Sequence, residues 1–347
     1  MPTVKAYAAL SAAAPLVPFA LERRLPGPRD VVIDLAWCGI CHSDLHQVRD
    51  EWGGAKFPMV PGHEMVGTVS KVGAGVTRFK VGDLAGVGCM VDSCRDCAPC
   101  RKGLEQFCQK GAAFSYNSTE MDRKTVTQGG YSGQVVCDEA FTLRIPKGLD
   151  LAGAAPLLCA GITTWSPLRH WKAGKGSKVG VVGLGGLGHM AVKLAAALGA
   201  EVTMLSTSRA KEADARRLGA HEFALTSDKA TFKTLAGRFD LLIDTISAPH
   251  DYNAYLGMVA IDGTMVLLGV PPAPTPVHAF SLIPGRKSLA GSLIGGIQET
   301  QELLDFCGQH GIVADVERVE ARRINEAFER MVKSDVRYRF SIDLSTL

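Results

Sequence analysis

The chain has 347 residues, of which 46% are hydrophobic and 21% charged, and its formal net charge is +3. This length favours two domains, each large enough to bury a core of its own. The composition excludes a disordered or fibrous chain. Because the lysines and arginines are scattered rather than gathered into a basic run, we expect no nucleic-acid partner.

The two most apolar stretches do not predict export or membrane insertion. Residues 1–21 are interrupted by Pro2, Pro15 and Pro18, so they lack the continuous apolar core of a signal peptide. Residues 179–200 are broken by several glycines and suit a buried strand, turn and helix better than a bilayer span. We therefore expect a cytoplasmic protein that is not associated with a membrane.

The texture of the sequence changes near residue 150. The preceding part is rich in glycine and proline, with short valine-rich runs at 31–35 and 65–72, which predicts an irregular β domain. Beyond it, buried strands alternate with helical stretches, as in a doubly wound parallel sheet. The predicted strands of this part are 178–182, 202–205, 239–246 and 264–268. After residue 287 we expect a strand, helices at 299–309 and 324–333, and a last strand at 338–344.

Four of the ten cysteines form a compact motif. Cys94, Cys97 and Cys100 are separated by two residues each, and Cys108 follows after seven more. Four thiolates at tetrahedral positions suit a closed, structural zinc site. Four unrelated buried cysteines are the plain alternative, although paired CxxC steps rarely arise without a metal or redox role. A zinc ribbon that binds nucleic acid is the other alternative, and the absence of a surrounding basic or aromatic patch disfavours it.

A glycine-rich turn predicts a dinucleotide site. Residues 178–188 read as a short apolar strand running into a GxGGxG turn, with a helix after it, which is the context that pyrophosphate binding requires. The turn residues expected to bind the cofactor are Gly183, Leu184, Gly185, Gly186, Leu187 and Gly188.

The residues about twenty positions further on indicate which dinucleotide binds. An NAD enzyme places a carboxylate there against the ribose 2′-hydroxyl, whereas this chain has Ser206, Ser208, Arg209 and Lys211. Hydroxyls and cations suit a 2′-phosphate, so we expect NADP(H). The alternative is that these side chains form only the solvated first turn of the next helix.

Two further segments carry metal-binding side chains. Residues 38–46 contain two cysteines and two histidines, and residues 61–64 contain a histidine followed by a glutamate. Either segment alone is more often structural than ligating.

Taken together, these motifs resemble those of the zinc-containing medium-chain alcohol dehydrogenases. The two segments, the four-cysteine loop, residues 159–163 and the glycine-rich turn occur in the order typical of that family, over essentially the whole chain. The resemblance implies that Cys41, His63 and Cys159 hold a catalytic zinc with one open coordination position, and that Glu64 orients the ligands or serves as an alternate ligand. It leaves Cys38 off the metal.

The same resemblance implies a proton relay and further cofactor contacts. Ser43 and His46 match the relay residues of the family, although His46 could also be an ordinary surface histidine. The additional cofactor-binding positions are His42, Thr163, Thr245, Val270, Ser292, Ile294 and Arg339.

Within the family, the chain is similar to the cinnamyl alcohol dehydrogenases and to microbial broad-range aldehyde reductases. Trp52, Phe114 and Leu293 occupy positions that line the substrate channel in the former. Phe114 replaces the usual tryptophan of the plant enzymes and Leu293 the usual phenylalanine, which argues against a pocket restricted to phenylpropanoids. Core packing is the alternative role for these aromatic side chains.

The resemblance therefore implies a fold and a reaction. The expected fold class is α/β, with a GroES-like irregular β catalytic domain made of residues 1–151 and 287–347 and a Rossmann doubly wound domain at 152–286. The expected function is reversible hydride transfer between NADPH and aromatic or aliphatic aldehydes, with two zinc ions per chain and a homodimeric state. A zinc-stabilised NADP-binding sensor or scaffold without turnover is the alternative; zinc-free quinone reductases generally lack the four-cysteine loop.

Overall fold

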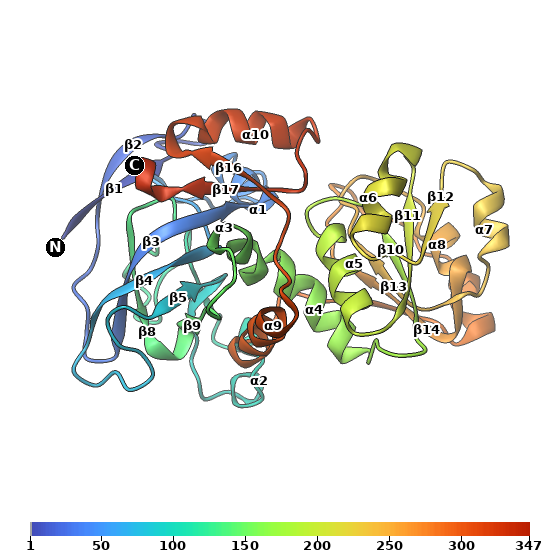
Figure 1. Cartoon of the computed structure of the whole chain (residues 1–347), viewed down its shortest axis with the longest axis horizontal. Helices are drawn as coiled ribbons and strands as arrows, with labels where there is room; N and C mark the ends of the chain where they lie inside the picture. The colour runs from blue at the N-terminus through green and yellow to red at the C-terminus, as the bar shows by residue number, and fades with distance from the viewer. Residues whose placement is uncertain (1) are drawn as a thin grey trace. The chain divides into compact units, whose positions relative to one another are not determined.

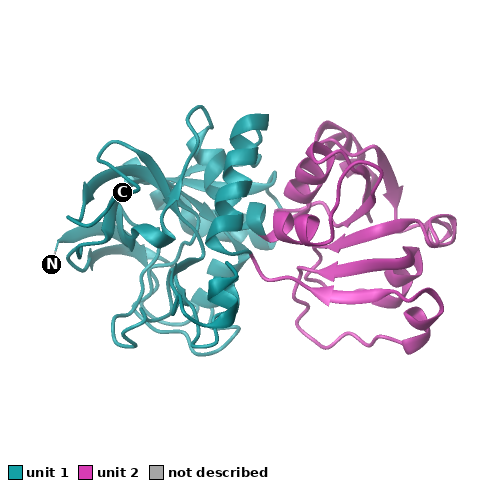
Figure 2. Cartoon of the chain, turned by 90° about the horizontal axis from the view of Figure 1, so that it is seen from below, with its two compact units in different colours: residues 1–162, 295–347 teal, residues 163–294 magenta. Residues whose placement is uncertain are grey.

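The computed structural model describes residues 2–347 and divides into two compact units. One unit contains the residues up to Ile162 together with Gly295–Leu347, and the other contains Thr163–Ile294 (Figure 2). The first division lies eleven residues beyond the boundary expected from the sequence, because the segment 151–158 packs against the sheet of the first unit. The second lies eight residues beyond the expected boundary.

The first unit is built mainly from β-strands (Figure 1). Its strands are β1 (Thr3–Ala8), β2 (Val17–Glu22), β3 (Asp30–Ile40), β4 (Met65–Val72), β5 (Leu84–Val87), β6 (Met90–Asp92), β7 (Ala113–Phe114), β8 (Gln134–Asp138), β9 (Leu143–Arg144), β16 (Val316–Glu320) and β17 (Arg339–Asp343). Its helices are α1 (His42–Val48), α2 (Ala98–Arg101), α3 (Leu151–Ala154), α9 (Ile297–His310) and α10 (Ile324–Val332), with short 3-10 turns η1 (Glu105–Phe107), η2 (Glu139–Phe141), η3 (Ala155–Leu158), η7 (Ala321–Arg323) and η8 (Leu344–Thr346). Helix α4 (Ala160–His170) begins in this unit and continues into the second.

Strand β3 organises the first unit. It pairs antiparallel with β4, β8 and β17, within a sheet ordered β16-β17-β3-β4-β5-β9. Strand β17 comes from the far end of the chain and pairs Phe340 with Ile40, the last residue of β3. Because both strands are largely buried, the C-terminal segment is part of the core of this unit. The carboxyl end of β3 is therefore held rigidly where α1 begins.

The second unit is a parallel sheet with helices. Its strands are β10 (Lys178–Val182), β11 (Glu201–Ser206), β12 (Glu222–Leu225), β13 (Phe239–Asp244), β14 (Val259–Leu267) and β15 (Ser288–Gly291). Its helices are α5 (Gly188–Ala197), α6 (Glu212–Arg217), α7 (Ala230–Thr234) and α8 (Tyr252–Met258), with 3-10 turns η4 (Arg209–Lys211), η5 (Ala279–Ser281) and η6 (Ile283–Gly285).

The strand order of this sheet is β12-β11-β10-β13-β14-β15, and every neighbouring pair is parallel. Strand order reverses direction between β10 and β13, so right-handed crossovers place α5 and α8 on opposite faces (Figure 1). Residues 179–182 of β10 are apolar and all buried, which fits a sheet that is covered on both faces. The α/β fold class predicted from the sequence is thus confirmed.

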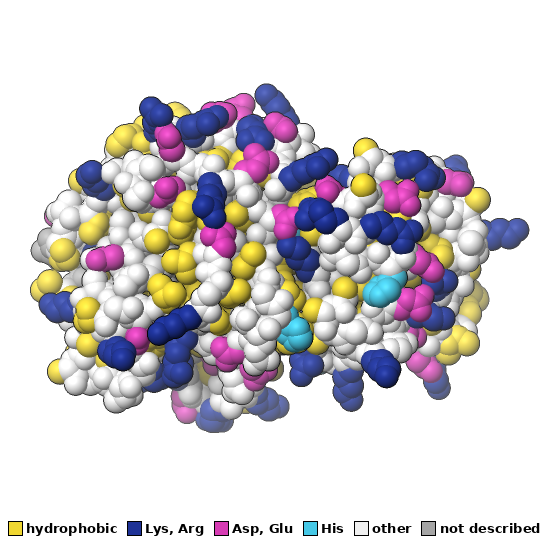
Figure 3. Space-filling view, in the orientation of Figure 1, with side chains coloured by type: hydrophobic (Ala, Val, Ile, Leu, Met, Phe, Trp, Pro, Cys, Tyr) yellow, Lys and Arg dark blue, Asp and Glu magenta, His cyan; other side chains and the backbone are white. Residues whose placement is uncertain are grey.

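The distribution of surface charges and the lengths of the helices agree with what the composition predicts. Figure 3 shows lysine and arginine side chains interspersed with aspartate and glutamate on the face it presents, without a large area of one sign. Among the described residues, no single helix is both long and apolar enough to cross a bilayer. One bent pair, 151–158 with 160–170, passes that test by length and composition only.

Candidate active site

Three predicted zinc ligands and the adjacent glutamate lie together in the first unit. The ligand atoms of Cys41, His63, Glu64 and Cys159 are all within 4.8 Å of one another. His63 Nε2 is 3.2 Å from Cys159 Sγ, although the two residues are 96 positions apart in the chain. Two thiols, an imidazole and a carboxylate form the mixed sulfur, nitrogen and oxygen set that zinc accepts.

Asp44 connects the segments that carry these ligands. Its buried carboxylate accepts hydrogen bonds from His63 Nδ1 at 3.1 Å, from the amide of Gly62 at 3.1 Å and from the hydroxyl of Tyr131 at 3.1 Å. It also accepts one from the amide of Cys41 at 2.9 Å, which makes it a capping residue of α1. Because a carboxylate only accepts, His63 carries its hydrogen on Nδ1 and directs Nε2 toward the thiols.

Glu64 and Arg339 form a buried ion pair beside the cluster. Arg339, on β17, is 5% exposed and contacts Glu64 Oε1 with Nη2, while Glu64 is fully buried. The other oxygen, Oε2, has no hydrogen-bond partner. A Cβ atom on Gly39 would lie 1.8 Å from that oxygen, so only glycine leaves room for the carboxylate here. An orphaned buried carboxylate oxygen among thiols fits a bound cation.

The charges of the cluster depend on one another. A hydrogen bond from Cys159, aided by Arg339 and His63, holds the pKa of Cys41 well below its usual value despite burial. Burial alone would lower the pKa of His63, but the charge of Asp44 raises it well above the ordinary value. Burial raises the pKa of Glu64 to about 7, and Arg339 opposes this shift. The protonation of each group therefore depends on its neighbours, and a metal bound here would release protons, because its ligands must be deprotonated.

The four-cysteine loop closes on itself. The sulfur atoms of Cys94, Cys97, Cys100 and Cys108 lie within 4.8 Å of one another, and the amides of Cys94, Cys97 and Gln109 point at sulfur from 3.3 to 3.4 Å. Hydrogen bonds from the Asp96 and Cys97 amides lower the pKa of Cys94 to about 6. No carboxylate or histidine joins this described cluster, so it fits a structural zinc with four thiolates.

Helix α1 carries both predicted relay residues on one face, three positions apart. Ser43 Oγ lies 3.6 Å from Cys41 Sγ, next to the cluster. His46 Nδ1 contacts a carboxylate oxygen of Glu51, and its ring stacks on Trp52 with 5.0 Å between centroids. The side chain of His46 is 32% exposed. The face thus runs from the cluster to solvent, and Glu51 is a partner that the sequence reasoning missed.

In the second unit, the glycine-rich turn has the expected form. Gly183 follows β10 with φ of 89°, and α5 begins at Gly188. A Cβ atom on Gly188 would lie 1.9 Å from the carbonyl oxygen of Gly183, whereas Gly185 faces open space. The close packing of strand against helix leaves the amino end of α5 free to receive a phosphate.

The residues predicted to select the cofactor lie after β11. Lys211 Nζ donates to the carbonyl of Leu184 in the glycine-rich turn at 2.8 Å, and Ser206 Oγ accepts from the amide of Ser208 at 3.2 Å. The side chain of Arg209 is 72% exposed and pairs with Glu212 at 3.4 Å. Lys211 therefore lies against the glycine-rich turn, while Arg209 is exposed beside Glu212.

The remaining predicted residues are divided between the units. His42 on α1 and Arg339 on β17 belong to the first unit, and the other predicted cofactor residues to the second. Of these, Thr245 donates to the carbonyls of Val182 and Gly183 at 2.8 and 3.1 Å. The others are Thr163 at 9% exposed, Val270 at 69%, Ile294 at 9% and Ser292, whose amide donates to Leu267. The predicted substrate residues Trp52 and Phe114 are in the first unit and Leu293 is in the second.

Two buried tyrosines and one cysteine complete the surroundings of the cluster. Tyr116 stacks on His63 with 5.8 Å between ring centroids, and Tyr131 binds Asp44. Cys89 is partly exposed, and a hydrogen bond with Cys159 lowers its pKa. None of the three could be found from local spacing, because each reaches the site through the fold.

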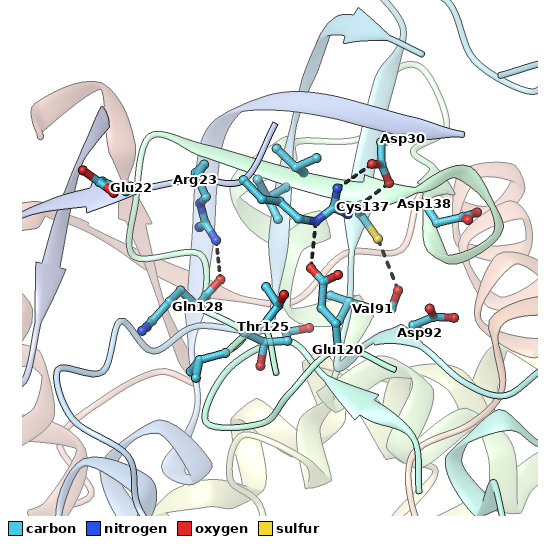
Figure 4. Close-up of a pocket in the computed structure, with 16 residues that line it drawn as sticks. Glu22, Arg23, Asp30, Val91, Asp92, Glu120, Thr125, Gln128, Cys137 and Asp138 are labelled. Carbon is cyan, nitrogen blue, oxygen red and sulfur yellow. Dashed lines mark hydrogen bonds and ion pairs between the residues drawn. The ribbon is translucent and has the colours of Figure 1, made fainter. Parts of the chain in front are cut away.

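A cavity of about 430 Å³ in the first unit lies apart from these residues. Arg24, one of its lining residues, binds Asp30 and Glu120, the latter at 2.7 Å, and Figure 4 shows these two carboxylates among the side chains that line the cavity. None of the predicted site residues lines this cavity. Its carboxylates are largely engaged by arginines, so it contributes to stability rather than to the predicted chemistry.

Known proteins with the same arrangement are enzymes. A model of the alcohol dehydrogenase GroES-like domain matches residues 27–147, and a model of the zinc-binding dehydrogenases matches residues 186–309. The NADP-dependent alcohol dehydrogenase C of Mycobacterium tuberculosis is 55% identical over 347 residues, which is 100% of both chains. The aldehyde reductase YahK of Escherichia coli is 52% identical, with 99% of both chains covered.

Solved structures agree with these matches. A cinnamyl alcohol dehydrogenase from Sorghum bicolor has a TM-score of 0.96 and 45% identity, covering 99% of this chain and 98% of its own. The cinnamyl alcohol dehydrogenase of Helicobacter pylori, solved in complex with NADP(H), has a TM-score of 0.92 and 40% identity, again covering 99% and 98%.

Proposed function

The chain belongs to the zinc-binding alcohol dehydrogenase family, and from this premise we propose that it is an NADP(H)-dependent enzyme that interconverts aldehydes and primary alcohols. The observation that carries the proposal is the cluster of Cys41, His63 and Cys159 with Glu64 beside it. Their donor atoms would hold a catalytic zinc, which as a Lewis acid would polarise a substrate carbonyl. The four-cysteine loop would hold a second, structural zinc.

The protein's own side chains prepare this site for proton transfer. Asp44 fixes the orientation of His63. Ser43, beside Cys41, is placed to exchange a proton with the substrate oxygen, and His46 is placed to exchange protons with solvent. Glu51 accepts from His46 Nδ1, so it holds the imidazole with Nε2 available.

Cofactor choice follows from the residues after β11. Ser206 stands at the end of this strand, where an NAD enzyme would carry a carboxylate, and Lys211 reaches the glycine-rich turn. We infer a preference for NADPH over NADH, because each ionised contact to the 2′-phosphate contributes about 1.5–3 kcal/mol. The family relatives named NADP-dependent support this inference.

The test compares the catalytic efficiencies for NADPH and NADH with benzaldehyde as the fixed substrate. The double variant Arg209→Ala/Lys211→Ala should raise the KM for NADPH by about tenfold or more per lost contact and leave that for NADH nearly unchanged. Ser206→Asp should weaken NADPH further, because a carboxylate repels the phosphate. A wild type that prefers NADH would refute the assignment of the cofactor, and NADPH binding without turnover would indicate a sensor or scaffold.

We further propose a broad range of aldehydes, a homodimer and a cytoplasmic location. Within the first unit Trp52 and Phe114 are 51% and 39% exposed, so neither side chain is buried as a core residue would be, which supports a role in binding substrate. Ile261, Ile283 and Phe280 are 66–74% exposed on neighbouring elements near the edge of the parallel sheet, as expected of a surface that another copy covers. All ten cysteines are free thiols, which favours a reducing compartment.

The dimer can be tested with one substitution on that surface. Ile283→Asp places a charge where the proposal requires apolar contact, so it should shift the mass measured by light scattering from two chains to one. A wild type that elutes as a single chain would refute the dimer.

A further inference from the structure

A histidine outside the predicted site lies at the end of the parallel sheet. His250 follows β13 in the loop 245–251, and its side chain is 12% exposed. Its Nε2 is 2.9 Å from Asp244 Oδ2, and its Nδ1 is 2.9 Å from the carbonyl oxygen of Ala248. Both partners only accept hydrogen bonds, so both ring nitrogens must donate and the ring is an imidazolium in this arrangement.

Asp244 ties the imidazolium to the strand. It is the last residue of β13 and is 1% exposed, and its Oδ1 accepts from the amide of Ile246 at 3.1 Å. The rings of Tyr252 and Tyr255 meet the imidazole edge-on, with centroids 4.9 and 5.5 Å away. His250 therefore closes the loop 245–251 onto the strand through a shielded ion pair.

This loop contacts two segments of the predicted cofactor site. Thr245 donates to the carbonyl of Gly183, the first glycine of the turn, and a Cβ atom on Gly183 would lie 2.9 Å from Ile246 Cγ1. At the other end, Ser247 Oγ accepts from the amide of Val270 at 3.4 Å. A loop that is released from Asp244 would loosen both the glycine-rich turn and the segment at Val270.

We propose that His250 is a positioning residue of the cofactor site, which in its protonated form clamps the loop 245–251 against the glycine-rich turn. The proposal rests on the NADP(H) function proposed above. His250 does not touch the reacting atoms. It acts through Asp244, Thr245 and Ile246.

The clamp should depend on pH. Burial lowers the pKa of His250, but the hydrogen bonds to Asp244 and Ala248 outweigh it and raise the pKa above 6.5. The charged groups that face the ring are Asp244 and Asp251. For a raised histidine pKa the interaction is complete below 6.5 and is lost as pH rises through the folded value. NADPH affinity should therefore fall as pH increases from 6.5 toward 9.

The experiment measures the dissociation constant for NADPH from the fluorescence of the bound nicotinamide, at intervals from pH 6.5 to 9. His250→Gln keeps a side chain of similar reach that cannot become charged. We expect it to weaken NADPH binding about three- to tenfold at pH 6.5 and to flatten the dependence on pH. At saturating NADPH its kcat should stay within about twofold of the wild type. His278→Gln is the matched control, because His278 is also in the second unit and its ring accepts only from the amide of Phe280.

The outcomes separate the two proposals. If the wild type does not bind NADPH, the proposed function fails, and this inference fails with it. If the wild type binds NADPH but His250→Gln and His278→Gln show the same affinity and the same pH dependence, only the inference fails. A lower melting temperature with unchanged affinity would likewise refute it, because that result describes a purely structural histidine. The same flattening in Asp244→Asn would support the clamp from its other side.

Discussion

Removing Arg339 should destabilise the first unit far more than removing an arginine from a surface ion pair. Arg339 is 5% exposed and its partner Glu64 is fully buried, so Arg339→Met would leave a carboxylate uncompensated in the core. Breaking one side of a buried pair costs about 3–5 kcal/mol. Methionine retains much of the apolar volume, so lost packing should contribute little to this cost.

The assay is urea unfolding of the zinc-loaded protein, with the free-energy change taken from the shift of the midpoint. The matched control is Arg322→Met, since the pair of Arg322 and Glu320 is 77% and 48% exposed and should contribute only about 0–1 kcal/mol. Adding Glu64→Gln to Arg339→Met should recover a large part of the loss, because no charge is then stranded. Equal losses in Arg339→Met and Arg322→Met would refute the reasoning.

Three further predictions concern the metals, the turn and the relay. Mild chelation should abolish activity before the protein unfolds, and an elemental analysis that finds one zinc per chain would contradict the two-zinc assignment. Cys159→Ala should abolish turnover with NADPH binding nearly intact, and an equal loss of turnover and of NADPH binding would contradict the assignment of Cys159 as a zinc ligand. Gly188→Ala should weaken NADPH binding at least tenfold in a fluorescence titration, because its Cβ would meet the Gly183 carbonyl at 1.9 Å; unchanged binding would show that the turn yields easily. Glu51→Gln should lower kcat by about tenfold with little change in KM and increase the solvent deuterium isotope effect, whereas an unaltered isotope effect would remove Glu51 from the support of His46.

Local sequence patterns predict those strands and sites whose residues are neighbours in the chain. The strands at 65–72 and 178–182 have the bounds that the apolar runs predict. The four-cysteine loop and the glycine-rich turn are each built from neighbours in the chain, so spacing alone identifies them. Strand β16 was missed because its sequence, Val-Glu-Arg-Val-Glu, lies at the edge of the sheet and carries charges on its exposed face.

The residues that hold the zinc ligands in place cannot be predicted in this way, because they are distant in the sequence and only the fold brings them together. Arg339 was assigned to the cofactor by family resemblance, and its partner Glu64 is 275 positions away. Tyr131 reaches Asp44 across 87 positions. His250 lies only six positions from its partner Asp244, but the spacing alone does not predict that the two side chains meet.

The two cysteines of the Cys38–Cys41 motif show how strand geometry selects a ligand. Residues three apart in an extended chain point to opposite faces, so Cys38 and Cys41 would point to opposite sides if both lay in one strand. Strand β3 continues to Ile40, beyond the residue 35 at which the apolar run ends, and it therefore includes Cys38 but stops before Cys41. The sulfur of Cys38 lies among the glycines 62 and 130, which have no side chain to displace it, and burial raises its pKa well above the ordinary value. Cys41 is the N-cap residue of α1. The thiolate rather than the neutral thiol ligates zinc. The sulfur of Cys41, and not that of Cys38, lies among the donor atoms of His63, Glu64 and Cys159, so Cys41 is the cysteine of this motif that fits the zinc site.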